Sequence, residues 1–170
     1  MANKIHRGGG ALVECINPNT NKWIVLWEPQ IEVTERGEES TSYIAETFNY
    51  KPSLEEVKST ILSWYNSSIE SEITNSYRWR DMPVWLSREN QLNYKAQYDL
   101  AVQTEGQSLP VTFKFGDEDA PVYYEFKNLE ELTDFYMGVT KHIQAILIKG
   151  WESKDGIDWS IYKTILEERT

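Results

Sequence analysis

The sequence predicts an α+β fold in which a small N-terminal β module precedes a helix/β-hairpin/helix body. Three observations predict it. Short runs typical of strands fill residues 11–50, capped segments with apolar residues three and four apart fill most of residues 51–170, and one clearly alternating hairpin interrupts the helices. We therefore divide the chain into an arm (1–10), a β module (11–50) and an α+β body (51–170).

The β module is predicted to contain three strands. Residues 11–16 and 22–27 are rich in β-branched and aromatic side chains, and the segment between them has the composition of a turn, so together they predict a hairpin. After a polar connection at 35–40, residues 43–50 predict the third strand.

The first ten residues lack apolar periodicity and include three successive glycines, which have high backbone freedom. We therefore expect a flexible arm that becomes ordered on a neighbouring subunit. Its Ile5 and Arg7 are candidate interface residues.

Four helices are expected in the body, over residues 54–73, 88–104, 129–150 and 158–166. Ser53 with Glu56, and Asn128 with Glu131, have the spacing of capping boxes, and Ser87 can cap the second helix. The third helix has the longest apolar stripe and is the strongest helix signal.

The hairpin at residues 109–126 is the clearest β signal. Two sets of alternating apolar residues are expected on its two strands, namely Val111, Phe113 and Phe115, and Val122, Tyr124 and Phe126. Because a two-stranded hairpin is marginally stable alone, we expect helices to cover this face.

Charge and composition exclude several classes of function. The chain has 17 basic and 27 acidic residues and a formal charge of −10, which disfavours nucleic acid as a partner. No apolar run is long enough for a membrane helix, so we expect no membrane association. The single cysteine, Cys15, excludes an internal disulfide, and without an apolar signal segment we expect synthesis in a reducing cytoplasm.

No catalytic motif is found in the sequence. His142 lies in an apolar helical stripe, which is typical of a structural histidine, and Cys15 lies in a strand without an activating cation, which is typical of a core thiol. Asp117, Glu118 and Asp119 cluster in a turn but lack the spacing of a calcium loop. We expect no enzyme activity, no cofactor and no metal, although spacing alone does not exclude a glycosidase pair of carboxylates.

Aromatic residues are abundant, with seven Trp, ten Tyr and five Phe. Such residues fill cores and anchor interfaces, and they also form platforms for sugar rings. One short region mixes aromatic and cationic side chains as interface hot spots do. Its candidate interface residues are Tyr77, Arg78, Trp79, Arg80 and Trp85.

Several segments carry a resemblance to a known group of proteins: 64–66, 82–101, 109–116, 132–136, 142–144 and 150–155. The chain resembles, over roughly Tyr50 to Tyr162, proteins encoded by tailed phages and prophages of gut Bacteroides-type bacteria. Its second half is similar to a domain of unknown function that ends many phage tail-fibre and fibre-assembly proteins. That domain has a hairpin, a helix with His-Ile-Gln near its end that closes on Gly-Trp, and a turn containing Lys-Asp.

The resemblance implies a structural protein of the phage tail, as a fibre-attachment, baseplate or tail-ring component. It implies partners among other tail proteins, a cyclic homo-oligomer, and a place in the virion after synthesis in the host cytoplasm. It supplies no catalytic residues, and it does not extend to the β module. Two alternatives stay open, a fibre-assembly chaperone and a carbohydrate-binding receptor module.

Overall fold

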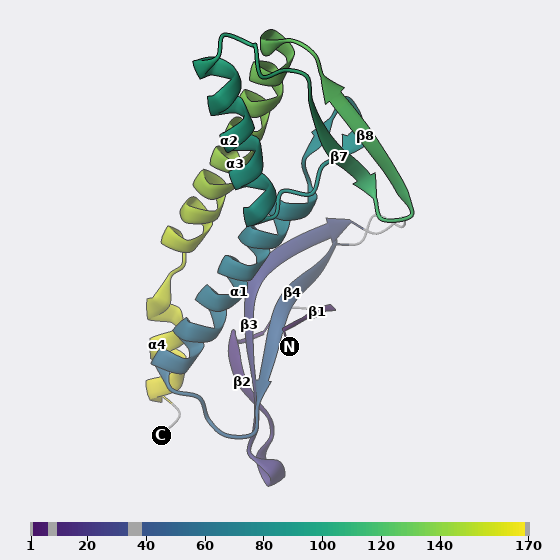
Figure 1. The fold of residues 1–170 in the computed structure, drawn as a ribbon. Coiled ribbons are helices and arrows are strands. Elements are labelled where there is room, and N and C mark those ends of the chain that lie inside the picture. Colours follow the sequence, from purple (N-terminus) through teal and green to yellow (C-terminus); the bar gives the residue numbers. More distant parts are fainter. Residues whose placement is uncertain (1, 7–9, 34–38, 169–170) are drawn as a thin grey trace. The chain divides into compact units, whose positions relative to one another are not determined.

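The computed structural model describes residues 2–6, 10–33 and 39–168 (Figure 1). The α+β class is confirmed, because antiparallel strands and helices occupy separate stretches of the chain. The chain forms two compact units: a sheet unit, Met1–Tyr65 with Lys154–Thr170, and an aromatic unit, Asn66–Ser153. No helix among the described residues is long and apolar enough to cross a membrane.

The sheet unit contains four antiparallel strands in the spatial order β1-β4-β3-β2. Their bounds are β1 Asn3–His6, β2 Val13–Asn17, β3 Lys22–Val33 and β4 Glu39–Phe48, with a short 3₁₀ helix, η1 Pro18–Thr20, between β2 and β3. The three predicted strands of the β module are therefore confirmed, and two of them are longer than expected.

The N-terminal arm differs from its expectation. Asn3–His6 form β1 and pair with β4, with Ile5 opposite Tyr43. Ile5 packs against an apolar cluster of the same sheet. The backbone groups of this strand, for which partners on a neighbouring subunit were expected, therefore pair within the unit. Arg7 lies outside the described residues.

Two helices cover one face of this sheet, α1 (Leu54–Asn75) and α4 (Trp159–Glu168). The Ser53–Glu56 capping box is confirmed: the Ser53 N–H donates to Glu56 Oε2 at 2.8 Å, and the Glu56 N–H donates to Ser53 Oγ at 3.3 Å. The core on this face combines residues of β2, β3 and both helices, namely Val13, Trp23, Val25, Trp27, Val57, Ile61, Tyr65, Tyr162 and Leu166. The boundary predicted at residue 51 therefore moves, because the sheet packs against helical residues of α1 and α4, which both follow it in the chain.

A bulge in β3 changes which residues face that core. The pairing with β4 shifts by one residue between Trp27 and Gln30, and Glu28 at the bulge has a φ of 53°. After the bulge, Ile31 lies opposite Thr41 and Val33 opposite Glu39. Because side chains alternate along a strand, Ile31 and Val33 lie on the face opposite to α1 and α4.

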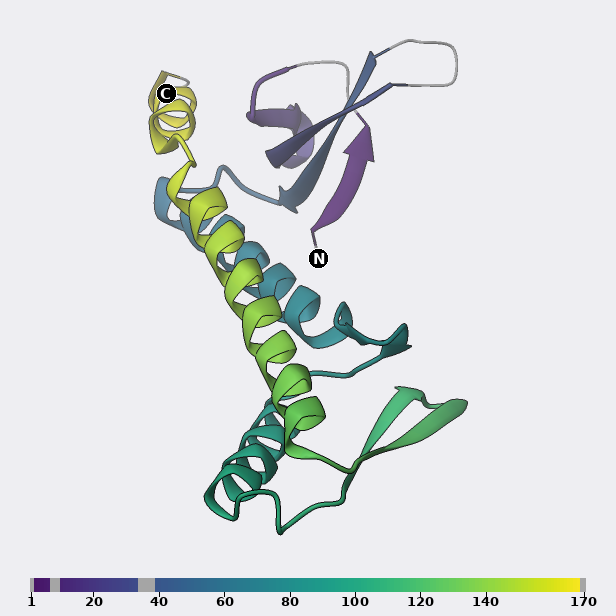
Figure 2. The ribbon, with the colours of Figure 1, turned by 90° about the horizontal axis from the view of Figure 1, so that it is seen from above.

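The aromatic unit contains two hairpins, one complete helix, a second helix that is nearly complete, and the end of α1 (Figure 2). The elements are β5 Arg78–Trp79, β6 Met82–Pro83, α2 Arg88–Gln103, β7 Val111–Asp117, β8 Ala120–Phe126 and α3 Leu129–Asp155, of which α3 ends just beyond the unit. The helix α2 begins where predicted, since the Asn90 N–H donates to the Ser87 hydroxyl at 3.2 Å.

The core of the aromatic unit confirms that helices cover the β7–β8 hairpin. Phe113, Phe115 and Phe126 of the hairpin are buried against Tyr94 of α2 and Phe135 of α3. The predicted apolar face is incomplete, because Val122 is 40% exposed. It lies close to the tip of the hairpin, where it pairs with Phe115.

Candidate functional site

Tyr77, expected at an interface, belongs to the core. Its ring lies against Phe135, with centroids 6.2 Å apart, and its hydroxyl is directed at the backbone of α3 beside Gly138. The neighbouring Arg78 is exposed, and its guanidinium donates to the Asp81 carbonyl across a tight turn. Both side chains therefore have contacts within the aromatic unit.

Trp79 and Arg80 also contact their own unit. Trp79 packs on Phe135, and the Arg80 guanidinium lies 5.2 Å from the Trp79 ring and 5.8 Å from the Tyr124 ring. Arg80 forms an ion pair of 2.8 Å with Glu131. Because of this ion pair, only one of the two hydrogen bonds of the capping box predicted for α3 is present. Asn128 caps α3 through the Glu131 N–H as expected, but the Glu131 carboxylate binds Arg80 and the Tyr124 hydroxyl instead of the cap.

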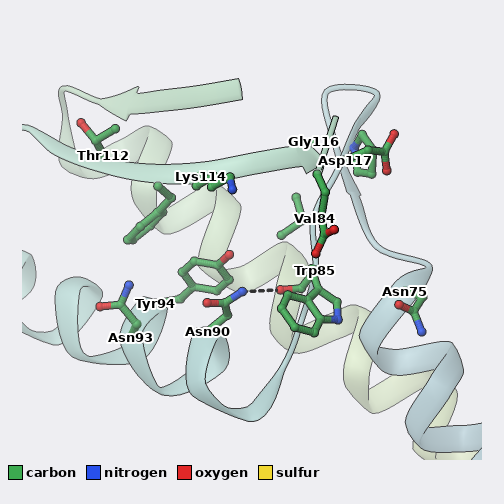
Figure 3. A pocket seen from close by; sticks show the side chains of 13 residues that line it. Asn75, Val84, Trp85, Asn90, Asn93, Tyr94, Thr112, Lys114, Gly116 and Asp117 are labelled. Atoms are coloured by element: carbon green, nitrogen blue, oxygen red, sulfur yellow. Dashed lines mark hydrogen bonds between the residues drawn. The ribbon is translucent and has the colours of Figure 1, made fainter. Parts of the chain in front are cut away.

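Among the aromatic candidate interface residues, Trp85 has the most exposed side chain, with 61% of its surface accessible. It lines a pocket of about 580 Å³ between α2 and β7 (Figure 3). Asn90 and Tyr94 reach this pocket from α2, while Lys114 and Asp117 reach it from β7. The pocket lies wholly within the aromatic unit.

The backbone that carries Trp85 is held firmly although its side chain is not. Val84 and Leu86 on either side are buried, and their N–H groups donate to the carbonyls of Tyr77 and Thr74 at 3.0 and 2.8 Å. The Asn90 amide donates to the Trp85 carbonyl at 2.8 Å, so the start of α2 also fixes this residue (Figure 3). The exposed indole is therefore presented by a rigid segment.

Several polar groups of the pocket lack partners among the residues that the structure describes. They include the side chains of Asn93, Lys114 and Asp117 and the hydroxyl of Tyr94. Tyr94 is only 3% exposed, and burial raises the pKa of its phenol to about 12, so it is a neutral donor and acceptor at physiological pH. The Tyr94 hydroxyl lies at the pocket wall, where a ligand or water can form hydrogen bonds with it.

Neither Cys15 nor His142 lines this pocket. Cys15 is partly exposed in β2 opposite Trp23. His142 Nε2 lies 3.3 Å from the Ser76 hydroxyl, but that hydroxyl is also 2.5 Å from the Glu72 carbonyl, to which it donates. Over the described residues, no group of three potential metal-binding side chains is present.

Sequence reasoning identified Trp85 from its aromatic character, but it did not identify the rest of the pocket. Asn90, Asn93 and Tyr94 had no signal beyond their place in a helix, and Lys114 was one polar position of an alternating strand. Only the packing of α2 on the β7–β8 hairpin brings them together. Comparisons of the chain with protein-family models, curated proteins and solved structures found no match.

The environment of His142 predicts a pH dependence of stability. Burial lowers the pKa of its imidazole from 6.5, and the nearby Glu72 carboxylate opposes this only in part. Above pH 6.5 the ring is neutral in both states; below it, the unfolded chain binds the proton first, so the free energy of unfolding falls.

We therefore expect His142→Gln to lose less stability than the original chain between about pH 7 and pH 5.5, as measured by urea unfolding. Gln144→Ala, an exposed change on the same helix, should keep the original slope. Equal slopes for His142→Gln and the original chain would contradict the prediction.

Proposed function

We propose that the protein is a non-enzymatic structural component of a bacteriophage tail that acts through contacts with other tail proteins and with further copies of itself. The resemblance over Tyr50 to Tyr162 supports the phage assignment. The observation that carries the proposed mode of action is an apolar surface on the sheet, formed by Ile31 and Val33 and called here the β3 surface.

The β3 surface extends an apolar cluster that includes no helical residue. Ile24, Leu26 and Ala45 are buried on this face of the sheet, next to Ile5, Leu12 and Tyr43. Ile31 and Val33 continue the same face beyond the bulge, and they are 70% and 68% exposed. Two adjacent, exposed, β-branched apolar side chains next to a buried cluster favour a protein contact.

Among the described residues, no strand pairs with the second edge of the later half of β3. The described pairing of β2 with β3 runs from Asn17 to Val13, opposite Val25, so the second half of β3 pairs only with β4. A strand edge that has no strand beside it can accept a strand from another chain. Apolar side chains and an open edge together suit the repeated subunit contacts of a tail ring.

Mass spectrometry of purified particles from a phage that encodes this chain tests the proposal. A tail component is expected in the particles at a fixed ratio to the other tail proteins. A fibre-assembly chaperone would be present in the infected-cell lysate and absent from the particles. If this protein were absent from both particles and tail assemblies, the proposal would be contradicted.

The double substitution Ile31→Thr and Val33→Thr tests the β3 surface. Threonine keeps the β-branched shape, and both side chains are exposed, so we expect the melting temperature to change little. We expect fewer copies per particle and weaker self-association in sedimentation velocity experiments, because the apolar contact is lost. Leu92→Thr, an exposed change on α2, is the matched control, and incorporation at the original ratio in the double variant would contradict the role of this surface.

A further inference from the structure

We propose that the pocket between α2 and β7 binds a neutral sugar ring, with the Trp85 indole as the stacking platform. This site is distinct in kind from the subunit contacts proposed above, and it does not depend on them. With a volume of about 580 Å³, the pocket falls in the range that holds small ligands.

The exposed indole is the first argument. Trp85 is the one lining side chain that presents a large aromatic face to the open pocket, since Tyr94 and Phe113 are each 3% exposed. An indole face carries partial negative charge, and the C–H groups on one face of a pyranose ring carry partial positive charge. Because the backbone of Trp85 is fixed on both sides, stacking a ring on it requires little further ordering.

The polar lining is the second argument. Besides the indole, the pocket is lined by Tyr94, Asn93, Lys114 and Asp117 (Figure 3). The polar groups of these four side chains have no partner among the described residues. Sugar hydroxyls both donate and accept hydrogen bonds, so one ring can pair with this mixed set. The Tyr94 hydroxyl is the key member, because the residue is held in the core while its hydroxyl reaches the pocket without a partner among the described residues.

The charges of the pocket favour a neutral ligand. Lys114 is opposed by the carboxylates of Asp117 and Glu118, which would repel a phosphate or an acidic sugar. A quaternary ammonium group prefers several open aromatic faces around it, whereas this pocket has one. The amide of Asn93 and the side-chain oxygens of Asn75 and Asn90, whose amide nitrogens bond within the protein, add neutral hydrogen-bonding capacity.

Titration of the isotope-labelled full chain, followed by amide and indole NMR signals, tests the site. The probes are N-acetylglucosamine, galactose, glucose and mannose, with glucuronate and choline as charged comparisons. We expect saturable shifts of the Trp85 indole and Asn93 side-chain signals with at least one neutral sugar. Shifts with glucuronate or choline alone, or no shift with any of the four neutral sugars, would overturn the proposal.

Three variants sharpen the test. Trp85→Ala should weaken the binding of that sugar about tenfold, which corresponds to about 1.4 kcal/mol of stacking and contact energy. Tyr94→Phe should weaken binding while keeping the melting temperature, because it removes only the unpaired hydroxyl. Tyr123→Ala, an exposed aromatic change on β8 outside the pocket, should bind as the original chain does. Unchanged affinity in Trp85→Ala, checked as folded by its NMR spectrum, would overturn the platform role.

Discussion

Phe135→Ala is expected to lower the free energy of unfolding of the aromatic unit by about 3–5 kcal/mol, the largest effect of any single change considered. The side chain is fully buried on α3 and lies at the centre of the core. Its ring centroid is 5.1–6.2 Å from those of six other aromatic side chains, Tyr77, Trp79, Tyr94, Phe113, Phe115 and Phe126. Truncation therefore leaves a cavity lined by rigid rings, which collapse into it poorly.

Urea unfolding followed by near-UV circular dichroism measures this effect. Tyr123→Ala is the matched control, because its side chain is 70% exposed and its loss should change stability by about 0.5 kcal/mol or less. Phe135→Leu keeps much of the volume and should cost less than Phe135→Ala, which keeps the comparison usable if the alanine variant fails to fold. A loss below about 1 kcal/mol for Phe135→Ala would show that the six rings do not depend on this centre.

The elements that the sequence predicted correctly are those with local signals. The helix α1 starts at a capping box formed by residues three apart, and α2 starts at Ser87, whose side chain accepts from Asn90. The β7–β8 hairpin has its alternation and its turn within one short segment. Local chemistry is sufficient for these elements, because all the interacting groups are within a few residues of one another.

The expectations that differed from the structure depend on distant partners. Ile5 becomes part of a strand only because β4, with Tyr43 opposite it, offers an edge. The bulge at Glu28 follows from how β3 pairs with β4, and it decides that Ile31 and Val33 face away from the helices. The Glu131 carboxylate, which was expected to cap α3, instead forms an ion pair with Arg80, a residue far away in the sequence.

The pocket illustrates the same limit for a functional site. The sequence indicated Trp85 as a candidate interface residue. The other side chains that line the pocket come mainly from α2 and β7, which follow Trp85 in the chain. Tyr94 has the spacing of an ordinary core residue, and it does belong to the buried cluster of the aromatic unit. Only the structure places its hydroxyl at the wall of an open pocket, where none of the described residues pairs with it (Figure 3).

Gly138→Ala is expected to lower the free energy of unfolding by about 1–2 kcal/mol, although alanine is the better helix former by about 1 kcal/mol. A Cβ at this position in α3 would lie 2.3 Å from the Tyr77 hydroxyl oxygen and 3.4 Å from Cζ of the same ring. The clash therefore involves one oxygen atom, and Tyr77 is buried and has little room to move.

Removing that oxygen should reverse the sign of the effect. In a Tyr77→Phe background the nearest atom to the new Cβ is at ordinary contact distance, so Gly138→Ala should then raise stability by up to about 1 kcal/mol through helix propensity. Tyr77→Phe itself should cost little, because its hydroxyl has one long hydrogen bond, 3.5 Å to the Phe135 carbonyl. Urea unfolding of the original chain, both single variants and the double variant measures the coupling. Equal losses from Gly138→Ala with tyrosine or phenylalanine at position 77 would show that the hydroxyl is not what requires a glycine there.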